Sequence, residues 1–269
     1  MEHPITLLDG ATGTALWAMA AERGIPRVPV WQYSITHPAL VAELTAQYAA
    51  AGSDIVLANS FCANPPAVER CPGFRAEAVV AAAVALAREN GRGAQVALSV
   101  GPLERVPRDR AERLAAAGAY DVQMGAGAEA GADLIFLETF WEPTLLTVAA
   151  ERAAQYGLPL FCSMTFEKTG ATFGGVTPAD MVRLLEPYHP DAVGLNCSCG
   201  PAASLPVLRD FARHTDLPLI YKPNAGEHTP ESFAEAVGPA LELAQYAGGC
   251  CGTTPADIAA LKQAIKAKK

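Results

Sequence analysis

Short apolar runs alternate with longer alanine-rich segments along the whole chain. The runs are rich in Val, Ile and Leu and hold few polar residues, which is typical of strands buried on both faces. Eight strands are predicted, at residues 5–8, 54–58, 95–100, 133–137, 159–163, 192–195, 217–221 and 243–248.

The segments between these runs have helical character. Several begin with proline, which is tolerated in the first helical turn because its missing N–H has no partner there. Helices are predicted at residues 38–51, 75–90, 109–130, 143–156, 178–185, 202–213, 230–244 and 255–266. Residues 21–37, which contain Pro26, Pro29 and Trp31, are interpreted as a long loop after the first strand.

Strands that alternate regularly with helices predict parallel strands joined by right-handed crossovers. Eight such units in 269 residues favour a closed (β/α)8 TIM barrel over an open doubly wound sheet. No linker divides the chain, so we expect one domain over residues 1–269. Active sites of such barrels lie at the carboxyl ends of the strands, and the residues that follow each strand are therefore candidates for chemistry.

Composition and charge exclude several classes of protein. Hydrophobic residues make up 51% of the chain, which is enough for a large core and excludes a disordered protein. The net charge of -8 has the wrong sign for binding a phosphate backbone, so we expect no nucleic-acid partner. The sequence starts without a basic, then apolar, leader and has no apolar stretch of membrane-spanning length, so a cytoplasmic protein without membrane contact is expected.

Cysteine placement carries the strongest chemical signal. Seven cysteines are an odd number, which favours reduced thiols or metal ligands over a disulfide framework. Cys197, Cys199, Cys250 and Cys251 follow the sixth and eighth predicted strands, at one rim of the barrel. Three thiolates would leave one position of a tetrahedral Zn²⁺ open, as in catalytic sites. The spacing alone leaves open a structural site that also uses Cys199, and small apolar fillers in a glycine-rich turn.

The other three cysteines, Cys62, Cys71 and Cys162, are not expected to bind metal. Cys162 lies within a predicted strand and is interpreted as a core residue. A loop of about a dozen residues follows the same strand, from Met164 to Gly175, and it is long enough to reach over the barrel mouth.

Three motifs carry a resemblance to a known family. Residues 8–14 (LDGATGT), 194–197 (GLNC) and 248–255 (GGCCGTTP) resemble the zinc-dependent homocysteine S-methyltransferases. Residues 194–201 and 224–226 (NAG) are similar in particular to the homocysteine-binding module of cobalamin-dependent methionine synthase. The S-methylmethionine-dependent branch of this family usually has arginine at the position of Gly252. The glycine makes membership of that branch less favoured.

The resemblance implies a zinc ion bound by Cys197, Cys250 and Cys251. The thiol of homocysteine would enter as the fourth ligand and accept a methyl group to give methionine. A thiol of pKa about 8.5 is mostly protonated at neutral pH, and a divalent cation favours its nucleophilic thiolate form.

The resemblance also implies contacts to the amino-acid end of the substrate. Glu138 is the expected ammonium partner and Asp9 would share that role. The carboxylate would meet backbone N–H groups of the glycine-flanked turn and the hydroxyl of Ser99. Asn59 is included among the residues expected to bind the substrate. Its alternative role is to brace a loop through hydrogen bonds. The predicted substrate-binding residues are Asp9, Gly10, Ala11, Thr12, Asn59, Ser99 and Glu138.

The motifs do not identify the methyl donor. The resemblance favours a methylcobalamin-carrying corrinoid protein supplied in trans, because one barrel accounts for all 269 residues. The alternative is a small donor such as S-methylmethionine, S-adenosylmethionine or a betaine, and another thiol could replace homocysteine as the acceptor. A non-catalytic zinc- or thiol-binding barrel is the alternative of a different class.

Overall fold

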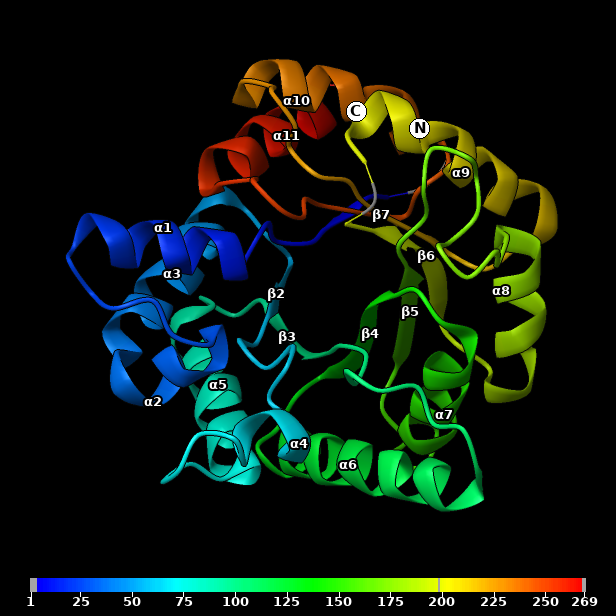
Figure 1. Cartoon of the computed structure of the whole chain (residues 1–269). Coiled ribbons are helices and arrows are strands. Elements are labelled where there is room, and N and C mark those ends of the chain that lie inside the picture. Colours follow the sequence, from blue (N-terminus) through cyan, green and yellow to red (C-terminus); the bar gives the residue numbers. More distant parts are fainter. Residues whose placement is uncertain (1–3, 198, 268–269) are drawn as a thin grey trace.

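The structure, a computed structural model, describes residues 4–197 and 199–267. Eight parallel strands form one sheet in the order β1-β8-β7-β6-β5-β4-β3-β2 (Figure 1). They are β1 (Thr6–Leu7), β2 (Ile55–Leu57), β3 (Gln95–Val100), β4 (Leu134–Phe140), β5 (Leu160–Met164), β6 (Ala192–Asn196), β7 (Leu219–Lys222) and β8 (Tyr246–Ala247). A parallel bridge between Leu8 and Ile55 joins the first strand to the second and closes the ring. The prediction of a (β/α)8 barrel is therefore confirmed.

Helices surround the strands as an outer ring (Figure 1). Seven of them begin at a proline: α3, α4, α7, α8, α9, α10 and α11. The sequence predicted this start for α3, α7, α8, α10 and α11. The α-helices are α1 (Gly13–Glu22), α2 (Tyr33–Thr36), α3 (Pro38–Ala51), α4 (Pro65–Val68), α5 (Ala76–Asn90), α6 (Arg110–Glu129), α7 (Pro143–Ala153), α8 (Pro178–Leu185), α9 (Pro201–His214), α10 (Pro230–Val237) and α11 (Pro255–Ala267). Short 3-10 helices occur at Val30–Gln32, Glu186–Tyr188 and Gly238–Glu242.

The apolar residues of the strands divide into two layers. In β4, Leu134 and Phe136 point into the barrel, where they meet residues such as Phe161 and Ile220. Ile135 of the same strand faces outward and joins the larger core between sheet and helices. This alternation requires apolar residues at every strand position, which explains the continuous apolar runs in the sequence.

A repeated contact joins the strands in pairs at their amino-terminal ends. Asp54, Asp133 and Asp191 each precede an even-numbered strand, and each side chain accepts the backbone N–H of one residue on the preceding odd-numbered strand. The donors are Leu7 (2.8 Å), Val96 (2.6 Å) and Leu160 (2.7 Å). Gln245 before β8 makes the same contact with the N–H of Leu219, at 2.7 Å. In all four pairs the backbone N–H of the Asp or Gln returns a bond to the carbonyl of the same residue.

Three sequence predictions need correction. Residues 13–22 form α1, which was not predicted, and the expected irregular segment 21–37 contains α2 and a 3-10 turn. The eighth strand is only Tyr246–Ala247, rather than residues 243–248. The predicted helix 230–244 is shorter in the structure, where the α-helix ends at Val237. The chain continues as the tighter 3-10 helix Gly238–Glu242, which ends before Leu243.

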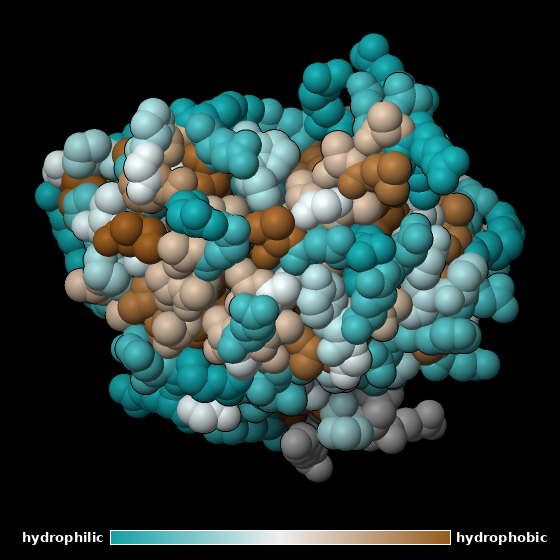
Figure 2. Space-filling view, turned by 90° about the horizontal axis from the view of Figure 1, so that it is seen from below, coloured by the Kyte–Doolittle hydropathy of each residue, from teal (hydrophilic) through white to brown (hydrophobic). Residues whose placement is uncertain are grey.

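The outer surface is of mixed polarity. Figure 2, which views the molecule from the lower side of Figure 1, shows apolar residues in several small groups surrounded by hydrophilic ones. Ile35, Leu114 and Phe173 are the exposed large hydrophobic residues of the described chain. No helix within residues 4–197 and 199–267 combines the length and the hydropathy needed to cross a bilayer.

Candidate metal centre

Three cysteine thiols converge at the carboxyl end of the barrel. Cys197 follows β6, and Cys250 and Cys251 lie in the loop after β8. Their sulfur atoms all lie within 4.8 Å of one another, and the Sγ atoms of Cys197 and Cys251 are 3.3 Å apart. Within the described ranges this is the only group of three or more His, Cys, Asp or Glu side chains that is close enough to hold a metal ion.

The geometry of this cluster fits a zinc ion. Tetrahedral zinc with Zn–S bonds of about 2.3 Å places its sulfur ligands about 3.8 Å apart. The observed sulfur separations, 3.3 Å for one pair and at most 4.8 Å for the others, bracket that value. The side-chain oxygen of Asn224 is buried and has no hydrogen-bond partner in the described chain. Asn224 lies on the loop after β7, which forms backbone hydrogen bonds with both Cys250 and Cys251. The three thiol sulfurs therefore suit a thiophilic cation that keeps a fourth coordination position for another ligand.

The three thiols already share a negative charge. Hydrogen bonds from Cys197 and Cys250 lower the pKa of the Cys251 thiol to about 3, against the opposing effect of burial. The same contacts raise the pKa of Cys250 well above its ordinary value. The contacts among the three thiols therefore favour the thiolate form at Cys251.

The other cysteines lie outside this cluster. Cys162 is fully buried in the core, as predicted, and Cys62 and Cys71 are on loops remote in sequence from the group. Cys199 follows β6 and its sulfur is not part of the group of three. The described structure thus supports three sulfur donors rather than four.

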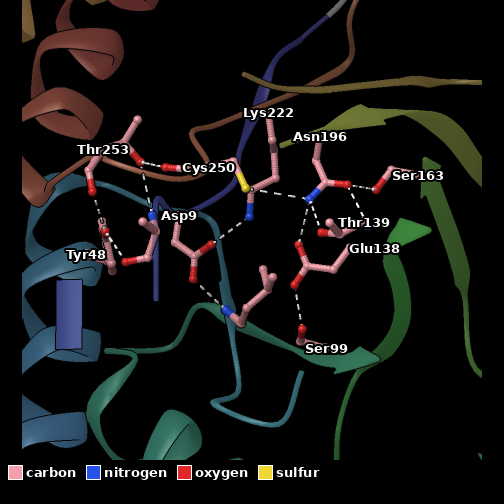
Figure 3. A network of polar contacts seen from close by, with 12 residues as sticks. Asp9, Tyr48, Ser99, Glu138, Thr139, Ser163, Asn196, Lys222, Cys250 and Thr253 are labelled. Carbon is pink, nitrogen blue, oxygen red and sulfur yellow. Dashed lines mark hydrogen bonds and ion pairs between the residues drawn. The ribbon is translucent and has the colours of Figure 1, made fainter. Parts of the chain in front are cut away.

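Glu138 lies next to the cysteine cluster in a buried polar network (Figure 3). It is part of β4, and its side chain accepts a hydrogen bond of 2.5 Å from the Ser99 hydroxyl and one of 3.3 Å from the Asn196 amide. Burial raises the pKa of the Glu138 carboxyl, while the Lys222 ammonium and the Ser99 hydroxyl oppose this effect. The predicted carboxylate-binding hydroxyl of Ser99 is therefore directed at Glu138.

Asp9 follows β1 and is bound by two donors inside the barrel. The Lys222 ammonium lies 3.0 Å from Asp9 Oδ1, and the Leu57 N–H donates to Oδ2 at 2.7 Å. Both side chains of the ion pair are 2% exposed. Although burial opposes it, Asp9 and Glu138 raise the pKa of the Lys222 ammonium, so that this lysine keeps its charge. Asp9 thus takes part in a buried ion pair, and its ammonium-binding role stays a prediction.

The glycine-flanked turn after β1 is fixed from behind by two residues. Ala11 N–H donates to Thr253 Oγ1 at 3.0 Å, and its carbonyl accepts from the Tyr48 hydroxyl at 2.8 Å. A Cβ at Gly10 would lie 2.7 Å from Thr253 Oγ1 and 2.8 Å from the Tyr48 oxygen, so only glycine fits there. Of the two predicted carboxylate donors, the Ala11 N–H is already bonded, whereas the Thr12 N–H has no partner in the described chain.

Asn59 braces a loop. Its amide donates to the Val30 carbonyl at 2.8 Å and to the Ser34 hydroxyl at 3.0 Å. These contacts hold the segment between α1 and α3, which matches the alternative role foreseen for this residue. Its contact with substrate stays a prediction.

The predicted site residues did not include Asn196, Lys222, Tyr48 and Thr253, although Asn196 had been considered as a brace for a loop, and Lys222 and Thr253 as residues at strand ends. Asn196 and Lys222 occupy the last positions of β6 and β7, where a polar residue ends an apolar run. That pattern was a usable signal for both. Tyr48 lies on α3, and nothing in the local sequence indicates its contact with Ala11.

A cavity of about 660 Å³ opens beside the cysteine cluster. It is lined by Thr139, Trp141, Thr165, Phe166, Glu167, Lys168, Phe173 and Cys199. Several of these residues belong to the loop after β5, which thus borders the barrel mouth as expected from its length. Thr165 also donates to the Cys197 carbonyl at 3.1 Å, which connects this cavity to the metal-binding residues.

The family model of homocysteine S-methyltransferases matches residues 6–265, nearly the whole chain. The chain belongs to this family. The resemblance seen in the three sequence motifs is thereby confirmed, and the zinc expected from it agrees with the cluster of three thiols.

Individual relatives agree with the family assignment. Homocysteine S-methyltransferase of Escherichia coli is 29% identical over 97% of this chain and 95% of its own length. The metallated form of the E. coli homocysteine methyltransferase MmuM superposes with a TM-score of 0.83 at 28% identity, covering 97% of this chain and 96% of that one. Methionine synthase of Mycobacterium tuberculosis is 34% identical over 51% of this chain, and the match spans only 13% of that longer protein.

Proposed function

We propose that this chain catalyses the transfer of a methyl group to the thiol of homocysteine to give methionine. The convergence of Cys197, Cys250 and Cys251 at the carboxyl end of the barrel, next to the buried acid Glu138, carries this proposal. A substrate that has both a thiol and an ammonium group matches these two features. The family membership supports the same activity.

Cys197, Cys250 and Cys251 would hold the zinc ion. When bound there, zinc would favour the thiolate form of the substrate thiol and keep it nucleophilic at neutral pH. The three protein thiolates leave the site electron-rich, which suits attack on a methyl carbon better than activation of a carbonyl.

The other residues would orient homocysteine. Glu138 would accept the ammonium group, with Asp9 as the second carboxylate of the site, since an ionised carboxyl has more lone pairs than its present donors use. The substrate carboxylate would meet the unpartnered Thr12 N–H at the start of α1, where the helix dipole favours an anion. Gly10 would let the turn approach closely, and Ser99 would hold Glu138 in place.

The activity is tested by measuring methionine formation and metal content on the same samples. Glu138→Ala should keep zinc but weaken homocysteine binding by about 2–4 kcal/mol, because it removes the partner of a buried ammonium. Exposed Glu77→Ala on α5 is the matched control and should bind homocysteine as the unaltered protein does. Unchanged homocysteine affinity in Glu138→Ala would reject the role given to this acid.

For the donor we propose a methylated corrinoid protein that docks at the rim of the barrel. Arg108, Arg110 and Arg113 are exposed and have no salt-bridge partner in the described chain, although the protein as a whole is acidic. Together with Arg152 and the acids Asp109 and Glu151, they line a second cavity of about 530 Å³ between α6 and α7, beside Leu114, which is 65% exposed. Because α6 and α7 both start after strand ends, this basic and apolar surface lies at the same end of the barrel as the thiols. It suits an acidic carrier protein.

The donor is tested by supplying S-methylmethionine, free methylcobalamin and the methylated cobalamin-binding fragment of a methionine synthase separately. The triple variant Arg108→Glu, Arg110→Glu, Arg113→Glu should lower methyl transfer from the fragment by about tenfold at low salt and leave transfer from free methylcobalamin unchanged. Efficient turnover with S-methylmethionine alone would replace the corrinoid donor by the small one. A chain that binds zinc and homocysteine but accepts no methyl group would support a non-catalytic binding protein.

A further inference from the structure

Asn196 stands at the centre of the polar network shown in Figure 3. It is the last residue of β6, precedes Cys197, and is fully buried. Its side-chain oxygen accepts hydrogen bonds of 2.7 Å from both the Thr139 N–H and the Ser163 hydroxyl. One carboxamide thus ties the ends of β4, β5 and β6 together.

The amide nitrogen of Asn196 faces three acceptors. It donates to Thr139 Oγ1 at 2.7 Å and lies 3.3 Å from Glu138 Oε2 and 3.7 Å from Cys250 Sγ. Glu138 is the acid assigned to the substrate ammonium, and Cys250 is one of the metal-binding thiols. A single NH₂ group therefore bridges the two halves of the proposed substrate site, which come from β4 and from the loop after β8 (Figure 3).

Two residues next to Asn196, its hydrogen-bond partner Thr139 and its chain neighbour Cys197, adopt a backbone conformation that L-residues rarely use. Thr139 has φ of 62° and Cys197 has φ of 54°. Such left-handed values are unfavourable for residues other than glycine, and most of all for a β-branched residue such as threonine. Asn196 binds both the N–H and the hydroxyl of Thr139 and so holds this strained residue in place. Strain of this kind persists only where surrounding contacts determine it, often at functional sites.

The chemistry of the surroundings requires a carboxamide. The Thr139 N–H and the Ser163 hydroxyl need an acceptor, whereas the Glu138 carboxylate oxygen and the Cys250 sulfur face the amide nitrogen as acceptors. Aspartate would bring a negatively charged oxygen against these two acceptors. An apolar residue of similar size would leave all five groups that contact this carboxamide without their partner.

We propose that Asn196 is a positioning residue that couples recognition of the substrate ammonium to the metal-binding thiols. This inference rests on the proposed function. With Glu138 and Cys250 held by one NH₂ group, a thiol at the metal and an ammonium at Glu138 are bound at a fixed separation. Once the thiol of homocysteine is bound at the metal, its ammonium group meets Glu138 at a high effective concentration. A thiol without an ammonium group cannot form this second contact, so its affinity does not benefit from it. The N–H···S contact also draws charge from the Cys250 sulfur.

The test compares homocysteine with 4-mercaptobutyrate, which has the same thiol and carboxylate but no ammonium group. Asn196→Asp keeps the acceptor oxygen for Thr139 and Ser163 and replaces the NH₂ donor by a negatively charged oxygen that faces Glu138 and Cys250. We expect it to weaken homocysteine binding by about 30-fold or more and 4-mercaptobutyrate binding by less than about threefold, with the metal retained. In the cobalt-substituted protein, the sulfur-to-cobalt charge-transfer absorption should shift.

Ser163→Ala is the matched control, because it removes one 2.7 Å bond to Asn196 without touching Glu138 or Cys250. It should preserve the preference for homocysteine and the cobalt spectrum. If Asn196→Asp does not fold, Asn196→Ser, which removes the whole carboxamide without adding a charge, is compared with the two thiols in the same way. Equal weakening of both thiols, or an unchanged preference for homocysteine, would overturn the inference. Failure of the unaltered, zinc-loaded protein to bind homocysteine would overturn the proposed function itself, whatever the variants do.

Discussion

Lys222 places a positive charge inside the barrel, beneath the three thiols. Its ammonium lies 3.0 Å from Asp9 Oδ1 and 5.7 Å from the centre of the Phe136 ring. The two carboxylates of the site, Asp9 and Glu138, both raise its pKa, although burial opposes them. This charge offsets part of the negative charge of the carboxylates and thiols, so that acidic groups can gather in one buried place.

Replacement of this lysine by an uncharged residue of similar length tests its role as counter-charge. Lys222→Met should lower the free energy of unfolding by about 3–5 kcal/mol, because Asp9 would remain as a buried charge without its partner. Lys262→Met is the control, since it breaks a partly exposed pair with Asp54 and should cost less than about 1 kcal/mol. Denaturant unfolding measures both values. Similar losses in the two variants would contradict the special role of Lys222.

The cysteine cluster gives the second prediction at this scale. Cys250→Ala should remove both zinc and methyl transfer, because two thiolates hold the ion far less well than three. Cys199→Ser should keep nearly full metal content, since its sulfur lies outside the group of three. Metal analysis of the purified, reduced variants decides between them. Zinc retained by Cys250→Ala, or lost from Cys199→Ser, would require a different ligand set.

The gathering of Cys197, Cys250 and Cys251 at one rim was predictable from sequence because each follows a strand, and parallel strand ends share one rim. The choice of these three without Cys199 came from the family resemblance. The partners of Ala11 were not predictable, because Tyr48 and Thr253 reach it from α3 and from the segment before α11. Such contacts depend on how the ring of strands closes. The pattern of a single segment does not contain that information.

At the scale of elements, the barrel is held by paired strands. Asp54, Asp133, Asp191 and Gln245 each bind the odd-numbered strand before them through side chain and backbone. The sequence placed Asp54 and Asp133 within strands, whereas both lie just before them and act through their side chains. Helix α1 was not predicted from the sequence because it lacks the usual signals of a helix start. It begins at Gly13, has no side-chain N-cap and has no acidic residue in its first turn.

Removal of one such strand contact should affect stability and not chemistry. Asp191→Ala leaves the Leu160 N–H without its 2.7 Å partner and should cost about 1–2 kcal/mol in unfolding free energy. Asp216→Ala, at an exposed aspartate, should stay within about 0.5 kcal/mol of the unaltered protein. Both variants should bind zinc normally. A loss of zinc in Asp191→Ala would show that the two ends of the barrel are not independent.

At the scale of the whole molecule, stability and chemistry occupy opposite ends of the barrel. The Asp and Gln contacts lie where strands begin, and the thiols, Glu138 and Asn196 lie where strands end. This division is usual for the fold, in which the carboxyl ends of the strands carry function. The metal would link the loops after β6 and β8, so its binding should stabilise the native state as a whole.

Metal removal should therefore lower the thermal stability of the entire domain. Each kcal/mol of binding free energy should shift the unfolding midpoint by about 2–4 °C, and a chelator should reverse the gain. Cys250→Ala should unfold at the same temperature with and without the chelator. Calorimetry measures this, and a midpoint of the unaltered protein that does not respond to chelator and zinc would contradict a metal site that spans the two loops.

The most direct test of thiol activation is X-ray absorption at the zinc edge of the reduced, metal-loaded protein, with and without homocysteine. The account predicts one zinc per chain with three sulfur ligands and a fourth sulfur after homocysteine is added. The absence of zinc, or a shell of four sulfurs that does not change with homocysteine, would contradict it.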